Sequence, residues 1–156
     1  MSPPPMILLH LTFAFLSYAA FLIACVSGML FLIQERQLKH KTMGRLFHSL
    51  PSLETLDHVN FLSISAGFAL LSAGVGLGVL GSALLLGRWW PDDPKAYLTL
   101  LLWAAYCVLW MVRLRATLRG HRVALYSMLS FGLVLLTFAG ASRLAPSWHP
   151  ALRIHG

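Results

Sequence analysis

The sequence predicts an all-α, polytopic membrane protein with four transmembrane helices and both termini on the outer side of the membrane. The first observation is composition: of 156 residues, 58% are hydrophobic and 11% are charged, and the mean hydropathy is +0.72. Soluble domains carry about 25% charged residues. The second is that the apolar residues form four long runs, and the third is that basic residues concentrate in alternate links between the runs. We therefore expect lipid to be the solvent for much of this chain.

Four apolar runs approach or exceed the length of about 20 residues that a helix needs to cross a bilayer. They cover residues 6–33, 61–86, 96–112 and 123–141. Because open strands leave backbone groups unsatisfied in lipid, runs that are apolar on all sides favour helices. The third run is short, and we expect Arg113 and Arg115 at its end to extend their charged groups to the interface. Residues 6–149 form a single domain in this interpretation, and residues 150–156 form an external tail.

The positions of the basic residues predict the orientation of the spans. Eight lie in the segments 34–60 and 113–122: Arg36, Lys39, Lys41, Arg45, Arg113, Arg115, Arg119 and Arg122. Four lie elsewhere: Arg88, Lys95, Arg143 and Arg153. Cytoplasmic links carry an excess of Lys and Arg, so we place both basic segments in the cytoplasm and both termini outside. A patch for nucleic acid would not alternate with spans, so the net charge of +7 does not indicate a nucleic-acid partner.

The second run is rich in glycine, and Gly74 and Gly78 form a G-x-x-x-G pattern. Such a pattern allows two helices to approach closely in a membrane. Three interpretations remain open at this point: contact with a second copy of the chain, packing inside the bundle, and room for a flat ligand.

Topology divides the seven histidines into two groups. Four fall on the inner side among basic residues, where we expect them to be solvated: His40, His48, His58 and His121. His10, His149 and His155 fall on the outer side. His10 lies just inside the first apolar run, and an ionisable group within a membrane is a candidate functional residue. An ordinary interfacial histidine is the alternative.

The segment "GRWWPDDPKAY", residues 87–97, joins the second and third runs on the outer side. Tryptophan rings stack on porphyrins and imidazole nitrogens bind iron, so Trp89 and Trp90 between His10 and His149 suit a heme. Arg88, Lys95 or Arg143 would then pair with the propionates. An interfacial belt of tryptophans explains the same composition. Asp92 and Asp93 are adjacent in sequence and would point apart, so they do not suit acid–base catalysis as a pair.

Three sequence motifs resemble those of a known family. They are "LPSLETLD", the segment "WWPDDPKAYLTLLLWAAY", and "TFAG" near the end of the fourth run. Together they are similar to the CcsA/ResC proteins of System II cytochrome c biogenesis and, more loosely, to CcmC and HemX-like membrane proteins. The resemblance covers residues from about His10 to His149 and corresponds to the C-terminal half of the family's chains.

The resemblance implies an external, tryptophan-rich WWD domain that holds heme b, with two external histidines as axial ligands. His10 and His149 match these histidines, and His155 is the rival for the second position. Trp89 and Trp90 would face the porphyrin, and Asp93 would position the loop. The basic residues Arg88 and Lys95 complete the predicted heme-binding set.

Three departures from the family pattern are visible. The WWD loop is shortened, with Asp92 where the family usually has another tryptophan, which implies weaker heme retention. Met111 stands where CcsA has an intramembrane histidine. The additional N-terminal spans of CcsA have no counterpart in this sequence.

The function implied is heme handling in cytochrome c assembly. The protein would bind heme at the outer face of the bacterial inner (plasma) membrane and present it to apocytochrome c beside a ResB/CcsB-type subunit. We expect a carrier that orients heme and not an enzyme that acts alone, although with its partner it would belong to a cytochrome c heme lyase complex. Two alternatives remain: a HemX-like regulatory or scaffold protein of tetrapyrrole metabolism, and an electron-transfer subunit with permanently bound b-type heme.

Overall fold

The computed structural model describes residues 5–41, 51–87, 89, 94–115 and 120–143. Within these residues the chain forms helices and no strand, which confirms the all-α prediction. The helices are α1 (Pro5–Lys39), α3 (Leu53–Leu86), α4 (Pro94–Leu114) and α5 (His121–Arg143). Each corresponds to one of the four apolar runs of the sequence.

Three helical segments are long and apolar enough to cross a membrane, and a fourth apolar segment is shorter. The three are Pro5–Lys39, Leu53–Leu84 and Ala96–Leu114, and the shorter one is His121–Thr137. The protein is therefore a multi-pass membrane protein. At 1.5 Å per residue, α1 and α3 are each about 50 Å long, whereas the hydrocarbon core is about 30 Å thick. Both helices therefore extend beyond the hydrocarbon region.

The extension of α3 begins earlier than the apolar run predicted. The Ser52 side chain accepts a hydrogen bond from the backbone N–H of Thr55 at 3.2 Å and caps the helix before Leu53. A capped start satisfies one of the free N–H groups of the first turn. The polar residues from Leu53 to Asn60 are thereby helical and belong to the bundle.

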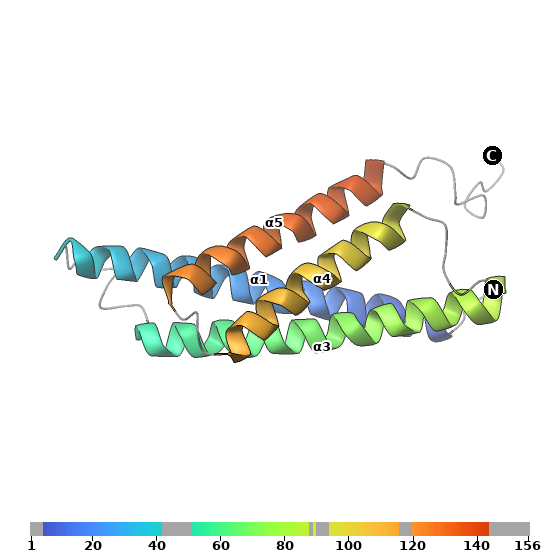
Figure 1. Cartoon of the computed structure of the whole chain (residues 1–156), viewed down its shortest axis with the longest axis horizontal. Coiled ribbons are helices and arrows are strands. Elements are labelled where there is room, and N and C mark those ends of the chain that lie inside the picture. Colours follow the sequence, from blue (N-terminus) through green and yellow to red (C-terminus); the bar gives the residue numbers. More distant parts are fainter. Residues whose placement is uncertain (1–4, 42–50, 88, 90–93, 116–119, 144–156) are drawn as a thin grey trace, which may run out of the picture.

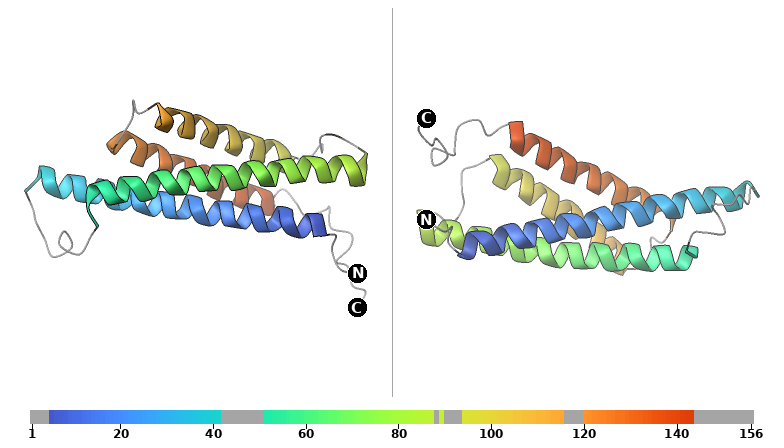
Figure 2. Two further views of the ribbon diagram at one scale, coloured as in Figure 1. Left: turned by 90° about the horizontal axis from the view of Figure 1, so that it is seen from below. Right: turned by 180° about the vertical axis from the view of Figure 1, so that it is seen from behind.

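Each helix packs mainly against two others. Helix α1 lies along α3 and α5, and α4 lies along the same two helices, so the four form a closed ring of neighbours. The two long helices, α1 and α3, run side by side in opposite directions (Figures 1 and 2). We call the end where α1 and α4 finish and α3 and α5 begin the basic end. The opposite end, which carries Trp89, is the tryptophan end.

Helices α4 and α5 are inclined to the α1–α3 pair. Figure 1 shows them crossing the pair near the basic end and lying apart from it at the tryptophan end. The rear view in Figure 2 shows the same divergence. The bundle is therefore most closely packed toward the basic end.

An aromatic stack fills the centre of the bundle. The rings of Phe21 in α1 and Tyr106 in α4 lie with centroids 3.5 Å apart, and both residues are fully buried. A Cβ atom at Gly67 would lie 2.4 Å from the Phe21 ring. The stack therefore requires glycine at this position of α3. In lipid, where close packing and polar contacts drive helix association, such approaches stabilise the bundle.

Two indole groups fix α4 on α3. Trp103 Nε1 donates a hydrogen bond to Ser72 Oγ at 2.9 Å, and Trp110 Nε1 donates to Ser65 Oγ at 3.2 Å. Buried indole N–H groups usually find a partner. These aromatic residues are therefore structural contacts between the helices.

Candidate functional site

His10 lies in the second turn of α1 and is partly buried against α3. Its Nδ1 atom is 2.8 Å from the carbonyl oxygen of Gly74. A Cβ atom at Gly78 would lie 3.2 Å from His10 Cε1 and 3.4 Å from Nδ1. The glycine pair of the sequence thus faces α1 within the bundle, and it accommodates the imidazole ring.

This hydrogen bond determines which ring nitrogen carries the proton. A carbonyl oxygen only accepts hydrogen bonds, so His10 Nδ1 must be the donor. In a neutral imidazole the other nitrogen, Nε2, then carries a free electron pair. Among the described residues, none forms a hydrogen bond with Nε2. His10 is therefore arranged as a metal-ligating histidine usually is, with one nitrogen bonded to a carbonyl and the other available.

The other predicted site residues are described in part. Trp89 lies two residues after Gly87, the C-cap of α3, at the tryptophan end, and it is 79% exposed. Four lie outside the described residues: Arg88, Trp90, Asp93 and His149. His155, the rival ligand, also lies outside them. The side chain of Lys95 is not described, although its backbone lies in the first turn of α4.

His10 lies deeper in the bundle than Trp89. Its neighbour Gly78 precedes the helix end at Gly87 by nine residues, which corresponds to about 14 Å along α3. Met6 lies near the start of α1, at the level of Gly81 in α3. Its Sδ atom would lie 3.6 Å from a Cβ atom added at Gly81. The last turns of α3 thus extend beyond the start of α1, between the level of His10 and that of Trp89.

A second polar cluster lies toward the basic end, and the sequence did not predict it. Arg113 Nη2 is 2.7 Å from Asp57 Oδ2 and donates to the backbone oxygen of Asp57 at 2.8 Å. The Arg113 side chain is 5% exposed, and its guanidinium lies 5.6 Å from the centroid of the Phe61 ring. The Arg113 guanidinium is therefore paired with a carboxylate on the neighbouring helix, whereas Arg115 is exposed.

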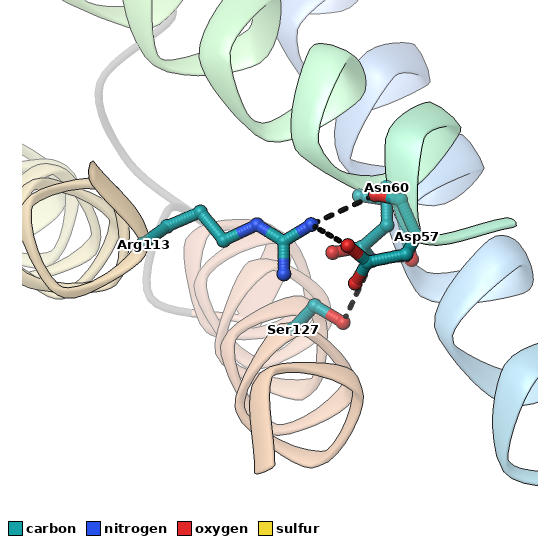
Figure 3. A network of polar contacts seen from close by, with 5 residues as sticks. Asp57, Asn60, Arg113 and Ser127 are labelled. Atoms are coloured by element: carbon teal, nitrogen blue, oxygen red, sulfur yellow. Dashed lines mark hydrogen bonds and ion pairs between the residues drawn. The ribbon is translucent and has the colours of Figure 1, made fainter. Parts of the chain in front are cut away.

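Asn60 lies one turn after Asp57 on α3 and contacts two other helices. Its Nδ2 donates to the Ala24 carbonyl oxygen of α1 at 2.7 Å and to Ser127 Oγ of α5 at 3.2 Å. We call Asp57, Asn60, Arg113 and Ser127 the basic-end cluster (Figure 3). It joins all four helices. Two of its buried atoms, Arg113 Nη1 and Asn60 Oδ1, have no hydrogen-bond partner among the described residues.

A surface ion pair lies further out at the same end. Glu35 of α1 contacts Lys39 Nζ at 2.9 Å and His121 Nδ1 of α5 at 2.7 Å. The His121 side chain is 54% exposed, as expected for a solvated histidine. Its contact with Glu35 also connects the start of α5 to the last turns of α1. Because the pair is exposed, we expect a small contribution to stability.

The described residues contain no group of three or more His, Cys, Asp or Glu side chains that would hold a metal ion. Among these residues, His10 is the histidine whose Nδ1 donates to a backbone carbonyl of the neighbouring helix, which leaves Nε2 available to a metal ion. This arrangement suits a metal centre that needs only one or two protein ligands, as heme iron does.

Comparison with known proteins identifies the family. The model of the family described as "Cytochrome C assembly protein" matches residues 3–149. The chain belongs to the cytochrome c assembly protein family. This confirms the resemblance drawn from the sequence motifs.

Curated relatives of this family share modest identity with the chain. Over 135 residues it is 29% identical to Protein HemX of Brevibacillus brevis, covering 86% of this chain and 50% of the relative. Over 158 residues it is 27% identical to the cytochrome c biogenesis protein CcsA of Guillardia theta, covering 92% of this chain and 52% of that protein. The chain thus spans about half the length of the curated relatives it matches. No solved structure matches it.

The structure gives one motif of this cytochrome c assembly protein a physical role. "LPSLETLD" contains Ser52, which caps α3, and ends at Asp57, which pairs with Arg113. The motif therefore starts a helix and places a carboxylate against the buried guanidinium of Arg113. The sequence contained a signal for this pair: Arg113 follows one apolar run and Asp57 shortly precedes another, so opposite charges lie at the ends of two runs.

Proposed function

We propose that this protein binds heme b at its tryptophan end and presents it to apocytochrome c during cytochrome c assembly. Family membership supports the assembly role, and the geometry of His10 supports the binding role. Heme would be the cargo of the protein, and its iron would supply the site for axial imidazole ligands.

The observation that carries the proposal is the His10–Gly74 hydrogen bond. It fixes the proton on Nδ1 and leaves the Nε2 electron pair without a partner among the described residues. An ordinary interfacial histidine would be expected to direct its polar nitrogens toward water and headgroups. His10 instead directs one nitrogen into the bundle, to a carbonyl in the middle of α3.

The remaining predicted residues complete the proposed site. His149 would be the second axial ligand, with His155 as its rival. Trp89 and Trp90 would stack on the porphyrin, and Asp93 would position the loop. Arg88 and Lys95 would pair with the propionates. The 79% exposure of Trp89 supports this proposal, since an aromatic side chain of that exposure has most of its surface available to a ligand.

The proposed orientation follows the positive-inside rule. The tryptophan end would face the outer side of the bacterial inner membrane, and the basic end would face the cytoplasm. As the family resemblance implies, heme attachment would need a further membrane subunit of the ResB/CcsB type. The protein itself would bind and orient heme.

A second candidate function is a regulatory or scaffold role in tetrapyrrole metabolism without heme transfer. The similarity to Protein HemX, which is as high as the similarity to CcsA, favours it. The two candidates differ in whether His10 affects cytochrome c maturation.

Co-expression with a ResB/CcsB-type subunit and an apocytochrome c tests the proposal. Loss of a group that supports a metal ligand typically lowers metal affinity or activity about 10–100-fold. We expect His10→Ala, which removes the proposed ligand itself, to lower the yield of covalently attached heme by at least as much. His58→Ala is the matched control, because His58 is an exposed histidine of α3 toward the basic end. Equal yields from both variants at equal protein levels would exclude the assembly role of His10 and favour the regulatory alternative.

A further inference from the structure

We infer that the Gly74–Gly78 face of α3 is a positioning element for His10, which holds the imidazole as its Nδ1–H tautomer and presents Nε2 to a ligand. The identity of that ligand as heme rests on the proposed function. The tautomer and the orientation of the ring do not.

A hydrogen bond from His10 to the backbone of α3 holds the imidazole ring. In an α-helix the Gly74 carbonyl already accepts the N–H of residue 78. A carbonyl oxygen has a second lone pair, and His10 Nδ1 uses it at 2.8 Å. This bond orders the ring against a rigid backbone and not against a mobile side chain.

The imidazole ring of His10 occupies the space beside Gly78. A methyl group at position 78 would lie 3.2 Å from Cε1 and 3.4 Å from Nδ1, closer than the roughly 3.5–4.0 Å of a normal carbon contact. The ring would have to move away from α3 and lengthen its bond to Gly74. Glycine at 78 is therefore what permits the short Nδ1–O distance.

The same helix offers two matched controls. A methyl group at Gly74 would meet Phe13 Cβ at 3.6 Å, an ordinary contact, and one at Gly76 would have no heavy atom within 4 Å. All three substitutions raise helix propensity in the same way. Only Gly78→Ala brings a methyl group against the imidazole.

Nitrogen-15 NMR of the purified protein in detergent tests the tautomer without any ligand. We expect His10 in the wild type to show the Nδ1–H form, and we expect Gly78→Ala to lose that preference while Gly76→Ala keeps it. A wild-type spectrum dominated by the Nε2–H form would overturn the inference. Because this measurement needs no variant, it stands even where Gly78→Ala does not fold.

Titration with hemin supplies the second readout. We expect Gly78→Ala to bind hemin about 10–100-fold more weakly, as is typical when a supporting group at a metal site is lost. Gly76→Ala should bind as the wild type does. Equal affinities for Gly78→Ala and Gly76→Ala would overturn the positioning role. If the wild type keeps the Nδ1–H form but binds no hemin, the positioning element stands and the proposed heme function fails.

Discussion

The polar side chains at the two ends of the bundle differ in their contacts. At the basic end, Arg113 is paired with Asp57, and Asn60 donates to two further helices. At the tryptophan end, His10 uses one nitrogen within the chain, and its other nitrogen has no partner among the described residues. The basic end also holds two buried atoms without a partner among the described residues, Arg113 Nη1 and Asn60 Oδ1, but its polar side chains join helices to one another. We propose that the basic end stabilises the bundle and that His10 at the tryptophan end binds a ligand.

Helix packing follows the same division. Helices α4 and α5 cross the α1–α3 pair near the basic end and diverge from it toward the tryptophan end (Figure 1). In a membrane, interhelical polar contacts and close packing replace the hydrophobic effect as the source of association. We therefore expect the basic-end cluster to hold the four helices together, including their segments at the tryptophan end.

Breaking the ion pair of the basic end should have the largest effect on stability. Asp57→Ala leaves the buried guanidinium of Arg113 without its carboxylate, which costs about 3–5 kcal/mol. Unfolding of the purified protein in mixed micelles measures the loss. The double variant Asp57→Leu with Arg113→Leu is the control, because it removes both charges and should recover most of the stability. If the single and double variants are equally stable, the ion pair does not anchor the bundle.

The surface ion pair of the same end should have a much smaller effect. Glu35→Gln removes the charge that contacts Lys39 and His121, and exposed pairs contribute about 0–1 kcal/mol. The same unfolding measurement at low and high salt checks this, since salt screens exposed charges. A loss comparable to that of Asp57→Ala would show that burial is not what distinguishes the two pairs.

The sequence predicted the helices well because apolar runs of this length have few other solutions in lipid. It also selected His10, since an ionisable residue within an apolar run is conspicuous. It did not predict the Arg113–Asp57 pair, because the two residues lie 56 positions apart and meet only when α3 and α4 pack. Nor did it predict the carbonyl contact of His10, since a backbone acceptor leaves no trace in sequence. Arg88, Trp90, Asp93 and His149 lie outside the described residues, so their roles stay predictions.

The absorption and electron paramagnetic resonance spectra of the hemin-loaded protein test the central claim most directly. Two axial imidazoles give low-spin iron, so the wild type should be low-spin. His10→Ala should bind hemin weakly or in a five-coordinate form, and added imidazole should restore part of the low-spin signal. A low-spin spectrum that persists unchanged in His10→Ala would contradict the account, because the free nitrogen at the tryptophan end would then not be the iron ligand.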